Sequence, residues 1–231
     1  MLDRPARRNA IDAALAAAIV DGISRVKDAG AIVLTGEDPA FCAGLDLREV
    51  GVDRLIELPP FLDAVATSPV PVIAAVNGPA ATGGLELALA CDFIVASTEA
   101  RFADTHLAVG VYPGPVLVDL PRRVGAAWAR EMTLTGRFVD ADTALRIGLV
   151  NHVVAHGDLV PFAVDLAAAI AEKDAGMVAD ARRDWDQHDC LPVTEARDAH
   201  LAFAIERGYD RSTADDLVAR GGDLLRRRGR S

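Results

Sequence analysis

A stretch of seven residues, 41–47, has the composition of a loop that offers a backbone N–H group to a ligand. Its sequence is Phe-Cys-Ala-Gly-Leu-Asp-Leu, and it follows an apolar run across a polar turn. Gly44 tolerates backbone conformations that a residue with a Cβ resists, so it can leave the N–H group of Leu45 unpaired and directed outward. An ordinary strand-to-helix connection with Asp46 as N-cap explains the same residues, so this loop alone does not decide between the two interpretations.

A second loop, residues 77–86, leaves another apolar run and enters a helix-compatible segment. Gly83 and Gly84 stand where this helix is expected to begin, and there the first-turn N–H groups lack partners and the helix dipole adds partial positive charge. A developing oxyanion would therefore be stabilised at Gly83. A tight turn in which glycines allow close packing is the competing interpretation.

The elements that must position these loops are short buried strands. Apolar runs at 31–35, 71–76 and 92–96 have the length and composition of such strands, and 149–154 is a further candidate. Helix-compatible spacing lies between them, and this alternation predicts parallel pairing. The helical segments that we expect in this part of the chain are 10–26, 52–66 and 84–90.

Both loops follow strands of the same predicted parallel sheet, so we expect them to open at the same edge, where ligands of such sheets bind. Two N–H donors on one thioester oxygen lower the barrier to any step that passes through an enolate. Loss of one such donor typically costs about 3–4 kcal/mol. The pair of loops therefore favours an enzyme that stabilises an enolate.

Beyond the last strand candidate the pattern becomes almost wholly helical. The sequence predicts an α/β core over residues 1–156, followed by a helical C-terminal region over 157–231. The helices expected in that region are 163–173, 177–188, 193–207 and 214–228.

Composition excludes several other classes of protein. A formal net charge of -10 argues against nucleic acid as the main partner. No stretch approaches the roughly 20 apolar residues of a membrane helix, and no signal-peptide pattern is seen at the N-terminus. The spacing of the three cysteines, Cys42, Cys91 and Cys190, fits neither a disulfide framework nor a metal site, so we expect reduced thiols and a cytoplasmic protein.

At the two loops, and along nearly its whole length, the chain resembles the crotonase superfamily of enoyl-CoA hydratases and isomerases. The resemblance implies a core of repeated ββα units and a helical C-terminal region that forms homotrimers, often paired as dimers of trimers. It implies an acyl-CoA thioester substrate, with no metal and no other cofactor. The segments that carry the resemblance are 2–10, which begins Leu-Asp-Arg-Pro, the loops 41–47 and 77–86, and 135–150, which begins Thr-Gly-Arg.

The resemblance also assigns roles to individual residues. The N–H groups of Leu45 and Gly83 would form the oxyanion hole, and Glu86 would be one of the two carboxylates that hold water in family hydratases. Contacts to CoA would come from Arg7, Arg8, Ala43, Asp46, Leu47 and Arg48.

Glu86 stands three residues beyond Gly83, in the first helical turn, so its side chain can face the same cleft as the two donors. A carboxylate placed there to favour the helix dipole is the alternative. The second family carboxylate is replaced by His106, which can act as base or proton donor or can be a structural histidine. Asp104 and Tyr112, nearby, receive no firm role.

Three functions stay open. The leading hypothesis is hydration of an enoyl-CoA, with water activated by Glu86 and proton delivery assisted by His106. A double-bond isomerase or another enolate-forming acyl-CoA enzyme is the second, and an acyl-CoA-binding protein without catalysis is the third. The chain departs from the family in two places. The opening strand is missing or truncated, so we expect that edge of the sheet to differ, and the final helix (215–228) lacks the acyl-pocket lid pattern, which leaves the acyl chain length open.

Overall fold

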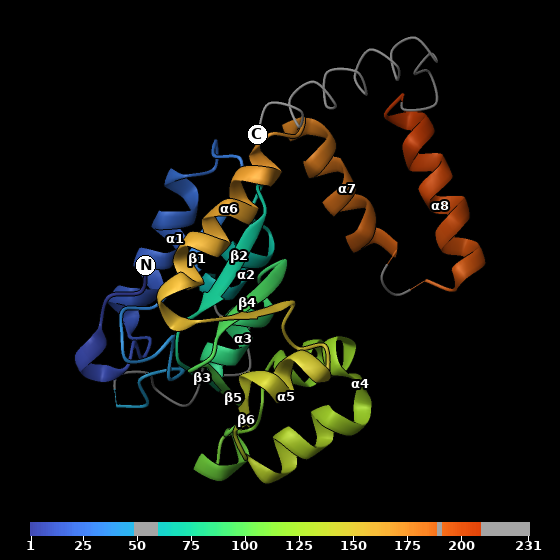
Figure 1. Cartoon of the computed structure of the whole chain (residues 1–231). Coiled ribbons are helices and arrows are strands. Elements are labelled where there is room, and N and C mark those ends of the chain that lie inside the picture. Colours follow the sequence, from blue (N-terminus) through green and yellow to red (C-terminus); the bar gives the residue numbers. More distant parts are fainter. Residues whose placement is uncertain (49–59, 189–190, 209–231) are drawn as a thin grey trace. The chain divides into compact units, whose positions relative to one another are not determined.

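A parallel sheet of four strands organises the N-terminal part of the chain (Figure 1). The order is β1 (Ile32–Thr35), β2 (Val72–Val76), β4 (Phe93–Ser97) and β7 (His152–Val154), and every neighbouring pair is parallel. All five residues of β2 are buried, as expected for a central strand covered on both faces. The predicted parallel pairing is confirmed, and the ends of β1 and β2 lie side by side.

The structure, a computed structural model, describes residues 1–48, 60–188 and 191–208. Its contacts divide the chain into two units, Met1–Ala175 and Gly176–Ser231. In the described residues, no helix is both long enough and apolar enough to pass through a membrane.

Alternate side chains of β2 enter two different hydrophobic clusters because successive residues of a strand point to opposite faces. Ile73 and Ala75 pack with Leu159 and Ala163 of α6 (Leu159–Ala171), which runs along one face of the sheet (Figure 1). Val72, Ala74 and Val76 belong to the larger core on the other face. Helices α1 (Ala13–Arg25) and α2 (Pro60–Ala66) pack on each other and bury apolar residues in that core.

A smaller sheet of three strands includes part of the second loop. Its order is β3 (Pro79–Ala81), β5 (Arg101–Ala103) and β6 (Val139–Asp140), parallel between the first two strands and antiparallel between the last two. Helix α3 (Gly83–Leu89) begins two residues after β3 ends, and all its residues are buried. The second loop thus contains strand β3 and the first turn of the buried helix α3, and these two elements fix its position.

Two helices of the first unit were not predicted, α4 (Val116–Thr135) and α5 (Ala141–Arg146). Helix α4 contains Pro121, and Gly125 within it has φ 78° and ψ 159°, so the chain is kinked there. Proline and glycine inside a helix weaken the sequence signal for one. Short 3₁₀ helices lie at Pro5–Arg7, Leu107–Val109 and His156–Asp158.

The second unit contains α7 (Ala175–His188) and α8 (Val193–Glu206), close to two of the predicted helices. Helix α6 belongs by its contacts to the first unit, although it follows the division that we predict at residue 157, and the domain assignment itself stays a prediction. The predicted helix 214–228 and the start of the predicted helix 52–66 lie outside the described residues.

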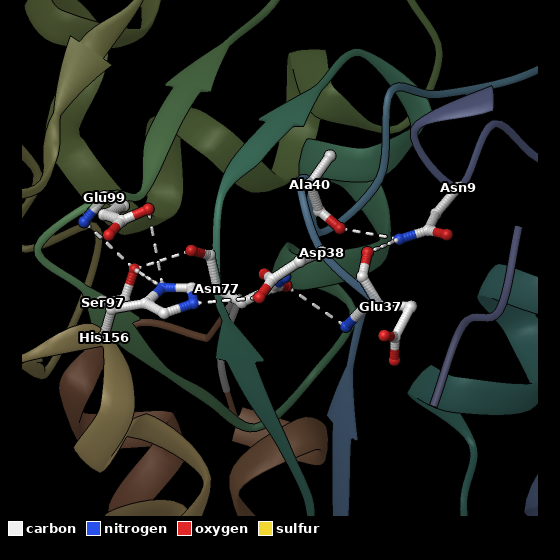
Figure 2. A network of polar contacts seen from close by, with 9 residues as sticks. Asn9, Glu37, Asp38, Ala40, Asn77, Ser97, Glu99 and His156 are labelled. Atoms are coloured by element: carbon white, nitrogen blue, oxygen red, sulfur yellow. Dashed lines mark hydrogen bonds and ion pairs between the residues drawn. The ribbon is translucent and has the colours of Figure 1, made fainter. Parts of the chain in front are cut away.

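A polar network joins residues at or just beyond the ends of all four strands of the main sheet (Figure 2). His156 Nε2 lies 3.1 Å from Asp38 Oδ2, Asn77 donates to Asp38 Oδ1 at 2.8 Å, and Ser97 Oγ donates to the Asn77 carbonyl at 2.7 Å. Hydrogen bonds from Asn77 and His156 lower the pKa of Asp38, and the bond to Asp38 raises the pKa of His156. The network holds the turn after β1 against the turn after β2.

Asn9 fastens that same turn to the N-terminal segment. Its side-chain amide is buried and donates to the carbonyls of Glu37 and Ala40, both at 2.7 Å (Figure 2). These carbonyls lie in the turn that leads into the first loop, so the start of the loop is held both by this network and by Asn9.

Candidate active site

The first loop directs the Leu45 N–H group away from the body of the protein. Gly44 has φ +94°, a conformation that glycine adopts without strain. The N–H group of Ile11 donates to the Gly44 carbonyl at 2.8 Å, and Asp46 N–H donates to the Ile11 carbonyl at 2.9 Å. In a planar trans peptide the N–H points opposite to the C=O, so the Leu45 N–H points away from Ile11.

Arg4 holds the far end of this loop. Its Nη1 lies 2.8 Å from Asp46 Oδ2 and donates to the Ala10 carbonyl at 2.9 Å, while its Nε lies 3.0 Å from Asp12. The hydrogen bond from Arg4 lowers the pKa of Asp46. The N-terminal segment 2–10, one of the segments that carry the family resemblance, therefore holds the first loop in place.

The second loop turns at Thr82, which has φ +56° and ψ −118°, a strained conformation for a residue with a Cβ. Thr82 N–H donates to the Ala103 carbonyl at 2.9 Å, and its carbonyl accepts from Glu86 N–H at 3.0 Å. Its hydroxyl lies 2.6 Å from that of Thr105. Because the Thr82 carbonyl points into the helix, the Gly83 N–H points out of its start.

The two amides lie next to each other. A Cβ built on Gly83 would stand 3.4 Å from the Leu45 nitrogen, and one built on Gly44 would stand 3.1 Å from the Gly83 nitrogen. Throughout the described ranges, neither amide has a hydrogen-bond acceptor. Two unpaired N–H groups at this separation can donate to one oxygen atom, as stabilisation of an oxyanion requires.

Both amides open into a pocket of about 110 Å³. Its wall combines the polar groups of the two loops with apolar side chains, among them Val109 and Val111, and with Tyr112. Six of the ten residues predicted for the site line it: Ala43, Leu45, Leu47, Gly83, Glu86 and His106.

Glu86 reaches the pocket from the first turn of α3 and is 6% exposed. Its Oε1 accepts a hydrogen bond from Val116 N–H at 3.2 Å. Burial raises the pKa of Glu86, and the nearby His106 opposes that effect. A raised pKa makes this carboxyl a stronger base once it is ionised, which suits it to acid–base catalysis.

His106 is the second titratable group in the pocket wall, and it is held by a carboxylate behind it. Its Nδ1 lies 2.7 Å from Asp104 Oδ1, and the Thr133 hydroxyl donates to Asp104 Oδ2 at 2.7 Å. Burial alone would raise the pKa of Asp104, but the hydrogen bonds from His106 and Thr133 outweigh it and the pKa lies below its ordinary value. Asp104 was given no firm role from the sequence, although the spacing Asp-x-His was a signal for this contact.

The other predicted CoA contacts lie outside the pocket wall. Arg7, Arg8 and Arg48 are exposed, and Asp46 pairs with Arg4. Their predicted contacts to CoA stay predictions. In the part of the chain that the structure describes, no cluster of histidine, cysteine and carboxylate side chains has the arrangement of a metal site.

Comparison with known proteins adds independent evidence. The model of the enoyl-CoA hydratase/isomerase family matches residues 1–203. A Rhizobium meliloti protein named a probable enoyl-CoA hydratase is 43% identical over 180 residues, which cover 74% of this chain and 70% of that protein. The crotonyl-CoA hydratase of Syntrophomonas wolfei is 36% identical over 193 residues, with 74% and 71% covered. The crystal structure of an enoyl-CoA hydratase from Mycobacterium avium superimposes with a TM-score of 0.76 at 38% identity, covering 91% of this chain and 92% of that one.

Proposed function

Because the chain belongs to the enoyl-CoA hydratase/isomerase family, we propose that it is an enoyl-CoA hydratase, which adds water to the α,β double bond of an enoyl-CoA thioester. The observation that carries this proposal is the pair of unpaired amides, Leu45 and Gly83, beside the buried carboxyl of Glu86 in one pocket. A thioester oxygen between the amides would place negative charge where both donors point.

The reaction divides into three tasks. The amides of Leu45 and Gly83 polarise the thioester carbonyl, so that the β-carbon becomes electrophilic and the charge of the enolate collects on the oxygen. Glu86 takes a proton from water while the water oxygen forms a bond to the β-carbon. By the resemblance, His106 stands where family hydratases carry their second glutamate. We infer that it assists transfer of that proton from Glu86 to the α-carbon, which completes the hydroxyacyl product and returns both side chains to their starting state.

An isomerase that moves the double bond is the second candidate. A single carboxyl can remove and return a proton on the same face of an enolate, and Glu86 is buried with a raised pKa. If His106 transfers no proton, Glu86 alone can still move the proton that an isomerase must transfer. A protein that binds acyl-CoA without turnover is the third candidate, and it keeps the same pocket.

Further proposals follow from the family rather than from a contact in the structure. CoA is contacted by Arg7, Arg8 and Arg48, the protein acts without a metal or other cofactor, and three chains form a homotrimer that can pair into a dimer of trimers. We also place the protein in the cytoplasm.

Incubation of the pure protein with enoyl-CoA thioesters of short and medium chain length tests the function. We expect loss of the ultraviolet absorbance of the conjugated thioester and a 3-hydroxyacyl product by mass spectrometry and NMR. Glu86→Gln should lower kcat by about 10²- to 10⁴-fold, the usual contribution of a general acid or base. The control is Glu131→Gln, on the exposed surface of α4.

The products separate the three candidates. A shifted double bond without added water favours the isomerase. Tight binding of every thioester without turnover, unchanged by Glu86→Gln, favours the binding protein and contradicts hydration.

A further inference from the structure

Three side chains form a buried hydrogen-bonded row behind the pocket. Thr133 on α4 donates to one oxygen of Asp104, and the other oxygen lies 2.7 Å from His106 Nδ1. The backbone N–H of His106 also donates to that second oxygen at 3.2 Å. Asp104 is fully buried and His106 is 7% exposed, so water does not compete for these bonds.

The row determines which nitrogen of the imidazole carries the proton. An ionised carboxylate only accepts hydrogen bonds, so the Nδ1 next to Asp104 Oδ1 must be the donor. The threonine hydroxyl occupies the other oxygen and keeps the carboxylate plane from turning. In the neutral imidazole the lone pair is then on Nε2, the ring nitrogen that Asp104 does not occupy.

His106 therefore has a carboxylate behind it and a second carboxyl nearby. Glu86 on α3 lies in the same pocket wall and interacts electrostatically with His106, and Asp119 on α4 acts more weakly on Glu86. A proton that His106 accepts at Nε2 gives an imidazolium that Asp104 stabilises from the far side of the ring.

We propose that Asp104 is a positioning residue that holds the proton of His106 on Nδ1, so that Nε2 is the atom that exchanges protons with water or substrate in the pocket. The inference deepens the proposed function and rests on it. It assigns no contact with substrate to Asp104, and it makes Thr133 the second support of the same histidine through the carboxylate.

Kinetics of isosteric variants test the proposal. Asp104→Asn keeps the shape but offers an amide, and we expect kcat to fall by about 10²-fold or more, within the range of lost acid–base catalysis, with KM unchanged. Thr133→Val should lower kcat by about tenfold, because one hydrogen bond to the charged group is lost. The matched control is Thr135→Val on the same helix, whose exposed hydroxyl donates to the Glu131 carbonyl instead. Unchanged kcat in both Asp104→Asn and Thr133→Val would overturn the proposal.

A spectroscopic measurement tests it without any turnover. In protein labelled with ¹⁵N-histidine, the His106 ring, identified by its loss in His106→Gln, should show a protonated Nδ1 and an unprotonated Nε2 in its neutral form. Asp104→Asn should shift this tautomer balance, and Thr135→Val should not.

A wild-type ring protonated on Nε2 would overturn the inference, even if hydration is observed. If hydration fails but the Nδ1 tautomer is found, the positioning role stands and the proposed function does not. The wild-type spectrum and Thr133→Val decide the matter if Asp104→Asn does not fold.

Discussion

The absence of a side chain at position 83 is what makes room for an oxygen atom between the two loops. A Cβ there would stand 3.4 Å from the Leu45 nitrogen, in ordinary contact with the neighbouring backbone, so the fold has space for it. A methyl group this near the Leu45 nitrogen would compete with the substrate oxygen that we propose to bind between the two N–H groups. Gly83 is thus required by chemistry more than by packing, whereas Gly44 needs its positive φ.

Gly83→Ala separates these two requirements. Alanine keeps the N–H group, but its methyl group should hold the thioester oxygen away from the two donors. We therefore expect kcat/KM to fall by about 10²- to 10³-fold, as much as when an oxyanion donor is removed, with little change in Tm. The control is Gly22→Ala, because Gly22 also lies in a helix and has open space around it. Steady-state kinetics and thermal unfolding of both variants provide the comparison, and full activity of Gly83→Ala would contradict the assigned hole.

Glu86 should cost the fold stability at the pH at which it works. Burial raises the pKa of Glu86 above the ordinary value of 4.5, so the folded protein binds the carboxyl proton more tightly than the unfolded chain does. The free energy of unfolding therefore falls as pH rises from 4.5 through the pKa of the folded state. Glu86→Gln removes the effect. Urea unfolding should therefore show that the variant gains stability relative to wild type between pH 5 and pH 8, and an equal difference at both values would speak against a buried, perturbed carboxyl.

The first loop depends on the N-terminal segment for its shape. Ile11 forms backbone hydrogen bonds to both sides of Leu45, Arg4 pairs with Asp46, and Asn9 holds the preceding turn. The sequence predicted the loop and the unusual backbone conformation at Gly44, because the conformational freedom of glycine is a local property. It did not predict these supports, since they join residues 28 to 42 positions apart that only the fold brings together.

Arg4→Met tests this support while keeping the aliphatic stem. Asp46 of the first loop should lose its ion pair with residue 4. We expect kcat to fall by up to about 10²-fold, as when a catalytic group is misplaced. Tm should fall as well. Arg25→Met is the control, because the exposed pair between Arg25 and Asp21 contributes little to stability. Wild-type kcat in Arg4→Met would show that the loop holds its shape without Arg4.

For the chain taken together, prediction succeeded where the pattern is strong and local. The four strands of the main sheet and helices α1, α3, α7 and α8 correspond to predicted segments. The small strands β3, β5 and β6 have two or three residues each, too few for alternation to be recognised, and α4 is interrupted by proline and glycine. Thr133 lies on this unpredicted helix, so its contact with Asp104 was not predicted either, whereas the roles of Glu86 and His106 rest on motif position and stay predictions.

Exposed apolar side chains on α4 are consistent with assembly of several chains. Leu134 is 71% exposed and Val118 is 53% exposed, and apolar surface of this kind often marks an interface. Sedimentation equilibrium at micromolar concentration should give three or six times the mass of one chain, as the resemblance implies. A monomer under these conditions would contradict the proposed homotrimer.

The most direct test of the oxyanion hole is a crystal structure of the protein with a bound enoyl-CoA or 3-hydroxyacyl-CoA. We expect the thioester oxygen about 2.7–3.2 Å from the nitrogens of both Leu45 and Gly83, with Glu86 beside the β-carbon. A thioester whose oxygen contacts neither amide, or that binds elsewhere on the protein, would contradict the account.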